Sequence, residues 1–322
     1  MQLSIVSTLY YSEPYLEEFV ERICASVEQI SSDYELILVN DGSPDDSLHK
    51  ALSLQQQYAR LKIVDLSRNF GHHEAGMTGL DQAQGEYVFL IDSDLEEAPE
   101  LMLDFWQAMQ NDQNVDVIYG VQEQRKGKWL EQFSGYLFYI IFNRLSPVKI
   151  STNALTVRLM KKNYVQAITQ YQERSLFVGG VMAHAGFNQQ AWVVTKKSKD
   201  STSYTFAKRL KLFFTCITSF STKPLEYLFS LGCGLLLLSI LAMLVVGFNY
   251  LIFSASISTI TAIFLAAGLV IGSVVSCTGL LGLYLAPMVT EIKQRPRTLI
   301  KTIFPGVDWY ALVIGRATKR TR

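Results

Sequence analysis

A long stretch without any charged residue constrains this chain more than any other feature of its sequence. No Asp, Glu, Lys, Arg or His occurs between Tyr227 and Thr290, although Asp, Glu, Lys and Arg make up 18% of the whole sequence. The surface of a soluble domain needs charge, whereas a helix that crosses a hydrocarbon core of about 30 Å needs roughly 20 apolar residues. The stretch is long enough for two such helices, so we predict a transmembrane hairpin with spans at 225–253 and 257–285.

Both flanks of this hairpin predict its orientation. The tail from 290 to 322 is rich in Lys and Arg, and by the positive-inside rule both ends of the hairpin are expected in the cytoplasm. At the other flank, residues 204–220 combine an apolar face with basic residues, which favours a helix in the membrane interface over an ordinary core-facing helix. Met1 leads into a strand pattern instead of a signal peptide, so the N-terminal domain is expected in the cytoplasm too.

The region before the hairpin alternates between strand and helix patterns. Strands are predicted at 3–9, 34–40, 61–66, 87–91, 116–119, 157–160 and 191–194, and helices at 13–30, 46–59, 73–83 and 129–145. This rhythm predicts an α/β fold with a doubly wound, mostly parallel sheet that is covered by helices on both faces. We therefore divide the chain into an α/β domain (1–200), an amphipathic interface helix (201–224), two transmembrane helices (225–289) and a basic cytoplasmic tail (290–322).

Two acidic residues give the sharpest chemical signal at the edge of this sheet. Ligands of open α/β sheets bind outside the carboxyl ends of the strands, and Asp92-Ser93-Asp94 comes directly after the strand at 87–91. Alternate residues of an extended segment point the same way, so the two carboxylates should converge. A hard divalent cation, Mg²⁺ or Mn²⁺, would offset their repulsion and bridge diphosphate oxygens. A solvated loop is the alternative interpretation.

Polar residues also follow the second and third strands. Asp41 lies in a turn with Gly42, where its carboxylate could accept hydrogen bonds from a uracil N–H or from ribose hydroxyls; a simple Asx turn is the alternative. Arg68 could contact phosphate or base carbonyls, or form only a surface ion pair. His72 and His73 are a poor pair of metal ligands, because adjacent residues of a helix do not face each other.

The distribution of basic residues bears on the partners. The net charge is +0, so no overall attraction to nucleic acid is indicated. An acceptor with a lipid phosphate would need cations near the membrane surface. The candidates are Arg125 and Lys128 before one amphipathic helix, Lys197 before the other, and Arg174 in between; solvated surface residues are the alternative interpretation.

The order and spacing of several segments resemble the family 2 glycosyltransferases of GT-A fold, and among them the polyprenyl-phosphate glycosyltransferases. These segments are IVSTLYYSE, LVNDGSPDDS, LSRNFGHHEAGMTGLDQAQGEYVFLIDSDLEEAPE, ERSLFVGG, ITSFSTKPL and EIKQRPR, and they extend over nearly the whole chain. The resemblance implies a cytoplasmic catalytic domain at the bacterial inner membrane, a nucleotide-diphosphate sugar donor (a UDP-sugar is expected), Mg²⁺ or Mn²⁺, and undecaprenyl or another polyprenyl phosphate as acceptor. It also implies inversion at the anomeric carbon, and it is compatible with a homo-oligomer.

The resemblance assigns roles by position. Asp94 matches the metal ligand, Asp92 the contact to ribose or phosphate, and Arg158 the arginine of a segment that reads VRLM here. We expect Asp92, Asp94 and Arg158 to act in catalysis. The nucleotide-sugar site is expected to contain Thr8, Tyr10, Asp41, Arg68, Asp92 and Ser93.

The chain departs from the family pattern at informative positions. Thr8 and Ser12 replace the usual Pro and Glu of the first loop, and Leu155-Thr156 stand where an acidic residue commonly precedes the arginine. A hydroxyl acceptor needs a general base. A phosphate monoester, with a second pKa of about 6, already carries an anionic oxygen. The missing acid therefore argues against a hydroxyl-directed envelope glycosyltransferase, and the intact acidic pair argues against a catalytically inactive membrane scaffold.

Overall fold

The structure is a computed structural model that describes residues 1–122, 153–171, 178–195, 223–227 and 259–306, with isolated positions between 140 and 252. The chain divides into two compact units. The first contains Met1–Tyr139, Val148–Tyr204 and Arg295–Arg322, and the second contains Ile140–Pro147 and Thr205–Gln294. The segment after the long apolar region thus belongs to the same unit as the N-terminus.

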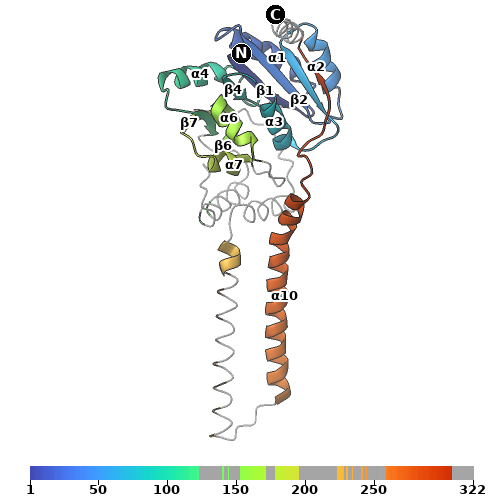
Figure 1. The fold of residues 1–322 in the computed structure, drawn as a ribbon, viewed down its shortest axis with the longest axis vertical. Helices are drawn as coiled ribbons and strands as arrows, with labels where there is room; N and C mark the ends of the chain where they lie inside the picture. The colour runs from blue at the N-terminus through green and yellow to red at the C-terminus, as the bar shows by residue number, and fades with distance from the viewer. Residues whose placement is uncertain are drawn as a thin grey trace, which may run out of the picture. The chain divides into compact units, whose positions relative to one another are not determined.

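The first unit is built on one mixed sheet with the strand order β7-β5-β6-β4-β1-β2-β3-β8 (Figure 1). The central strands β4, β1, β2 and β3 are parallel, whereas β6 and β8 run antiparallel to β4 and β3. The predicted mostly parallel sheet is therefore parallel at its centre and mixed at its flanks. The strands are β1 Leu3–Leu9, β2 Tyr34–Asn40, β3 Leu61–Leu66, β4 Tyr87–Leu90, β5 Val117–Gln122, β6 Ala154–Lys161, β7 Gln189–Val194 and β8 Ile300–Phe304.

Helices cover both faces of this sheet, as predicted. Neighbouring residues of β1 illustrate why: Ile5 packs into one core cluster and Val6 into the other, because successive side chains of a strand point to opposite faces. The first cluster includes side chains of α1, α2 and α4, and the second includes side chains of α3, α6 and α7. The helices are α1 Leu16–Glu28, α2 Ser47–Gln55, α3 His72–Asp81, α4 Leu101–Asn111, α6 Lys162–Thr169 and α7 Val178–His184.

The sequence patterns located the early elements well and missed several later ones. The strands predicted at 3–9, 34–40 and 61–66 have these same bounds in the structure. Helices α4, α6 and α7 were not predicted. Strand β8 lies in the segment expected to be a basic tail, and it pairs with the edge strand β3.

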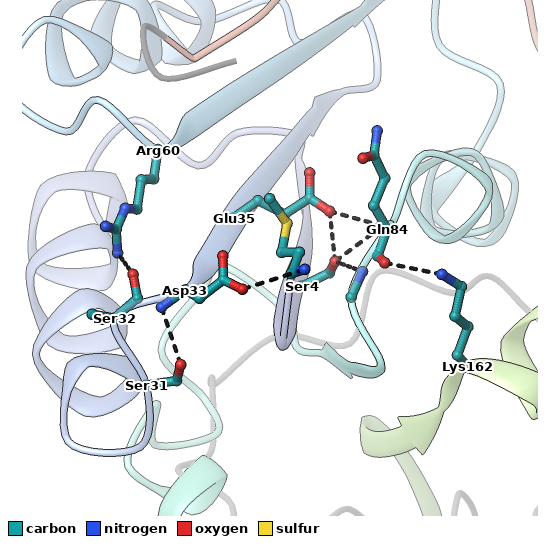
Figure 2. Close-up of polar contacts among 10 residues, drawn as sticks. Ser4, Ser31, Ser32, Asp33, Glu35, Arg60, Gln84 and Lys162 are labelled. Atoms are coloured by element: carbon teal, nitrogen blue, oxygen red, sulfur yellow. Dashed lines mark hydrogen bonds and ion pairs between the residues drawn. The ribbon is translucent and has the colours of Figure 1, made fainter. Parts of the chain in front are cut away.

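A buried polar cluster fixes the amino-terminal edge of the sheet (Figure 2). Ser4 Oγ donates a hydrogen bond of 2.6 Å to Glu35 Oε1, and the backbone N–H of Gln84 donates to the same oxygen at 2.8 Å. The N–H of Gly85 donates to Ser4 Oγ at 2.8 Å, and Lys162 donates to the Gln84 carbonyl. The cluster ties the segment before β4 to β1 and β2, at the edge opposite to the predicted ligand site.

The second unit contributes helix α10, Thr259–Ile292, which has 34 residues. Large apolar side chains are exposed along it; Val270, Val274, Leu281 and Leu285 are each 50% exposed or more. Within the described part of the chain, no helix satisfies the length and hydropathy expected of a membrane span. The predicted interface helix and most of the predicted span at 225–253 lie outside the described residues.

A close approach of α3 to the sheet gives a test of this packing. A Cβ added at Gly79 would collide with Val6 Cγ1 and would lie 3.0 Å from Val39 Cγ2, whereas one added at Gly76 would meet only Thr8 Cγ2, at 4.0 Å. We expect Gly79→Ala to destabilise the fold by about 1–3 kcal/mol through overpacking. Gly76→Ala is the matched control in the same helix, and it should be neutral or stabilising by up to roughly 1 kcal/mol.

Denaturant midpoints of the two purified variants in the same detergent measure the difference. Equal midpoints for Gly79→Ala and Gly76→Ala would contradict the packing of α3 on β1 and β2.

Candidate active site

The carboxyl ends of the four central strands bring the predicted donor-site residues to one edge. Thr8 lies near the end of β1, Asp41 follows β2, Arg68 follows β3, and Asp92 follows β4. Parallel pairing of these strands sends all four ends the same way. The structure thus gathers at one edge residues that the sequence separates by up to 84 positions, from Thr8 to Asp92.

The acidic segment is attached to β1 through its central serine. Ser93 is 3% exposed; its hydroxyl donates to the Thr8 carbonyl oxygen at 2.8 Å and lies 2.8 Å from the Ser12 hydroxyl. Ser12 is one of the departures from the family pattern, and here it is a direct partner of the acidic segment. Asp92 and Asp94 on either side are partly exposed, so their carboxylates remain accessible from the edge of the sheet.

The backbone after Ser93 turns sharply. Asp94 Oδ1 accepts a hydrogen bond of 3.1 Å from the N–H of Glu96, and Leu95 between them has a φ of 59°. This left-handed conformation is unfavourable for a residue with a branched side chain. The hydrogen bond from Glu96 therefore orients the Asp94 carboxylate within a strained turn.

His72 bridges two of the predicted site residues. Its Nδ1 lies 2.8 Å from Thr8 Oγ1, and its Nε2 lies 3.3 Å from Asp92 Oδ1. An imidazole that carries its proton on Nε2 would donate to Asp92 and accept from the Thr8 hydroxyl. The sequence pattern pointed to His72 only as a poor metal ligand and did not reveal this role, because the bridge depends on α3 starting beside the ends of β1 and β4.

Asp41 is deeply buried and organises the loop after β3. It is 1% exposed, and its two carboxylate oxygens accept hydrogen bonds from the N–H groups of Phe70 (2.7 Å) and Gly71 (3.0 Å). Burial raises the pKa of the Asp41 carboxyl, and the two backbone hydrogen bonds act in the opposite direction. In the structure, both carboxylate oxygens of Asp41 therefore accept hydrogen bonds from backbone N–H groups of the same chain.

The same turn explains why a glycine follows Asp41. Gly42 has a φ of 58°, and a Cβ there would lie 2.5 Å from the backbone N of Asn69. The turn after β2 thus packs directly against the loop after β3. In that loop Arg68 donates to the Asn69 carbonyl at 2.8 Å, and its guanidinium lies 4.0 Å from the centre of the Phe70 ring.

Tyr10 presents an exposed aromatic ring on a well-fixed loop. Its side chain is 47% exposed and makes an edge contact with Tyr11, with ring centres 4.9 Å apart. The N–H of Tyr11 donates to Ser43 Oγ (2.8 Å), whose hydroxyl donates to Asp45 (2.5 Å). Burial alone would raise the pKa of Asp45, but hydrogen bonds from Ser43 and Ser47 outweigh it and lower the pKa. An exposed ring held in this way is suited to stacking on a nucleobase.

Arg158 is a buried cation behind the acidic segment. It lies on β6 opposite Leu90 of β4, is 7% exposed, and donates to the carbonyls of Leu155 and Thr156, each at 2.9 Å. It also contacts Met182 Sδ. Burial lowers its pKa, while Coulomb attraction from groups that include Asp92 opposes this. Leu155 and Thr156 stand where the family commonly has an acidic residue. They therefore contact Arg158 through their backbone carbonyls.

The acidic pair could supply two carboxylates to a metal ion that bridges phosphate oxygens. Among the described residues, no group of three or more His, Cys, Asp or Glu side chains could hold a metal ion by itself. Mg²⁺ in nucleotide sites usually takes one or two protein carboxylates and completes its shell with phosphate oxygens and water. Asp92 and Asp94 provide the one or two protein carboxylates that such a site requires.

The predicted acceptor cations cannot be placed in this geometry. Arg125, Lys128, Arg174 and Lys197 all lie outside the described residues. Of the predicted site residues, the structure describes those of the donor side: Thr8, Tyr10, Asp41, Arg68, Asp92, Ser93, Asp94 and Arg158.

Comparisons with known proteins agree with this picture. A family model described as Glycosyl transferase family 2 matches residues 4–169. A protein of Mycobacterium tuberculosis (strain CDC 1551 / Oshkosh) named among the glycosyltransferases is 40% identical over 304 residues, which cover 94% of this chain and 89% of its own. The undecaprenyl-phosphate 4-deoxy-4-formamido-L-arabinose transferase of Shewanella sediminis is 26% identical over 328 residues, which cover 99% and 95%.

Among solved structures, that of S. aureus TarS 1-349 in complex with UDP-GlcNAc aligns with 68% of this chain and 66% of its own, at 17% identity and a TM-score of 0.46. The family model covers more than half of the sequence, and the mycobacterial relative matches it nearly end to end. The chain, with its mixed α/β sheet, therefore belongs to glycosyl transferase family 2 and is a glycosyltransferase.

Proposed function

We propose that this glycosyltransferase moves a sugar from a nucleotide-diphosphate donor, a UDP-sugar in the first instance, to undecaprenyl phosphate or a similar polyprenyl phosphate. The observation that carries the proposal is the donor-side edge of the sheet. There the Asp92 and Asp94 carboxylates lie on a segment fixed by Ser93 and His72, and Tyr10, whose ring is exposed, follows β1 at the same edge. The product would be a lipid-linked monosaccharide for modification of a cell-envelope glycan.

Two observations favour a lipid phosphate as the acceptor. The relatives from Shewanella sediminis and Proteus mirabilis are named for undecaprenyl phosphate, and each aligns with at least 94% of this chain. In addition, the positions before Arg158 hold Leu155 and Thr156 and supply no carboxylate. A phosphate oxygen that is already ionised needs no general base, whereas a sugar hydroxyl does.

The proposed membrane placement rests on charge and on exposed apolar surface. The stretch from Tyr227 to Thr290 has no charged residue, and α10 exposes large apolar side chains along its length. Lipid would cover these side chains, and the Lys and Arg residues after Glu291 favour a cytoplasmic end. We therefore place the enzyme at the cytoplasmic face of a bacterial inner membrane.

The reaction would be a single displacement. An anionic oxygen of the lipid phosphate attacks the anomeric carbon, the bond from that carbon to the diphosphate breaks, and its electron pair leaves with the nucleoside diphosphate. No proton is transferred, and the anomeric configuration inverts. A Mg²⁺ or Mn²⁺ ion held by Asp94 would supply positive charge to the leaving diphosphate. Tyr10 would stack on the base, and Asp92, positioned by His72, would bind ribose or phosphate.

An acceptor assay tests the proposal against both alternatives. Purified protein in detergent is incubated with Mn²⁺ or Mg²⁺, labelled UDP-sugars and either undecaprenyl phosphate or undecaprenol, which carries a hydroxyl in place of the phosphate. We expect label in lipid only with undecaprenyl phosphate. Transfer to undecaprenol would indicate a hydroxyl-directed enzyme. Failure of every donor with both lipids, together with failure to bind UDP, would indicate an inactive scaffold.

Asp94→Asn tests the metal role. We expect transfer to fall on the order of 100-fold or more, the size of loss when one charge-stabilising group is removed. Calorimetry should show that Mn²⁺ no longer strengthens UDP binding to the variant. Asp81→Asn, on the exposed end of α3, is the control and should behave as wild type. Unchanged turnover of Asp94→Asn would exclude this carboxylate from metal binding.

His72→Ala tests the bridge between Thr8 and Asp92. Loss of a hydrogen bond to a charged group costs about 1.5–3 kcal/mol, so we expect the KM for the donor to rise about tenfold or more. The KM for the lipid should not change. The control is His49→Ala, since His49 is an exposed residue of α2 paired with Asp46. A donor KM equal to that of the control would show that the bridge has no part in donor binding.

A further inference from the structure

The segment that follows α10 returns to the catalytic sheet and contacts the elements that carry the donor site. It comprises residues 297–304, which include strand β8 (Figure 1). We infer that this segment positions the donor site, with Thr298 and Lys301 as positioning residues. The inference rests on the proposed function of that site, and it extends the site to a part of the chain that sequence analysis took for a tail.

Backbone pairing brings the segment to the start of the loop after β3. Strand β8 runs antiparallel to β3, with Val64 opposite Ile303 and Leu66 opposite Ile300. The pairing continues past the strand, where the N–H of Ser67 donates to the Leu299 carbonyl at 2.9 Å. The loop that begins here provides the Phe70 and Gly71 N–H groups that bind Asp41. The segment thus holds the first residue of the loop on which Asp41 depends.

A second link runs through a buried carboxylate. Lys301 Nζ lies 3.6 Å from Asp65 Oδ2, and the other oxygen of Asp65 accepts a hydrogen bond of 2.7 Å from Asn40. The Asn40 side-chain oxygen accepts a hydrogen bond of 3.2 Å from the N–H of Ser43. Asp65 is 4% exposed, so its hydrogen bond with Asn40 is screened little by water, whereas the Lys301 side chain is 66% exposed and its ion pair with Asp65 is open to water. This chain of contacts connects β8 to both ends of the turn that contains Asp41.

A third link holds helix α3. Thr298 Oγ1 lies 2.7 Å from Thr78 Oγ1, and the Thr78 hydroxyl also donates to the Glu74 carbonyl at 2.9 Å. The Thr298 hydroxyl is therefore the donor in the bond between the two threonines. Arg297 donates to the Thr169 carbonyl at the end of α6. The first residue of α3 is His72, so the segment fixes the helix whose start bridges Thr8 and Asp92.

The three links converge on the segments that carry the predicted donor-site residues Asp41 and Arg68, and on the helix that begins with His72. Each ends on an element directly continuous with Asp41, with the loop at 67–71 or with His72. The segment also follows immediately on α10, which ends at Ile292. The chain therefore uses the residues next to its apolar helix to set the geometry of the nucleotide-sugar site.

Substitution of Thr298 separates positioning from stability. Thr298→Val keeps the size of the side chain and removes the hydroxyl, so we expect the donor KM and the dissociation constant for UDP with Mn²⁺ to rise about threefold to tenfold. The kcat and the KM for undecaprenyl phosphate should not change. Thr298→Ser restores the hydroxyl and should restore donor affinity. Thr302→Val, at an exposed position of the same segment, is the matched control.

A double substitution checks the contact itself. If the hydroxyl pair transmits the effect, Thr78→Val combined with Thr298→Val should weaken UDP binding no more than either change alone. Equal UDP affinity in Thr298→Val and Thr302→Val would overturn the inference, as would a loss of kcat with no change in donor KM. If wild-type protein bound no UDP at all, the proposed function would fail instead, so the two failures are distinguishable.

Discussion

Parallel pairing of β1 with both β2 and β4 is the constraint on which the rest of the molecule depends. It sends the ends of these strands to one edge, so that Thr8, Asp41 and Asp92 meet although they come from three separate β-α units. The opposite edge is closed by the Ser4–Glu35–Gln84 cluster, which fixes where β4 begins. The contacts that fix the start of β4 also fix its pairing with β1, and therefore the position of Asp92 at the end of β4.

The donor edge is held together by many contacts within the protein. Asp41 binds the backbone of the loop after β3, Ser93 binds the backbone of β1, and His72 joins Thr8 to Asp92. Such supports keep carboxylates in place before any ligand arrives, which lowers the cost of binding and of charge development during reaction. Asp41 and Ser93, which the sequence predicts for the ligand site, therefore also hold that edge together through contacts within the protein.

Residues that depart from the family pattern make specific contacts within the structure. Thr8 stands where proline is usual, and its hydroxyl meets His72; Ser12 replaces a glutamate, and its hydroxyl meets Ser93. Arg158 lacks an acidic neighbour in sequence and is satisfied by two backbone carbonyls. These contacts give a physical reason for an intact site with an unusual composition.

Local patterns in the sequence determined the central strands, the covering of both sheet faces and the position of the acidic pair, because apolar periodicity and strand ends are properties of short segments. They did not reveal β8 or the His72 bridge. Residues 300–304 are mostly exposed and acquire their role only by pairing with β3, more than 230 positions earlier. The role of Asp41 likewise depends on a loop some 30 residues away. Contacts of this kind are decided by tertiary packing, since no short segment contains both partners.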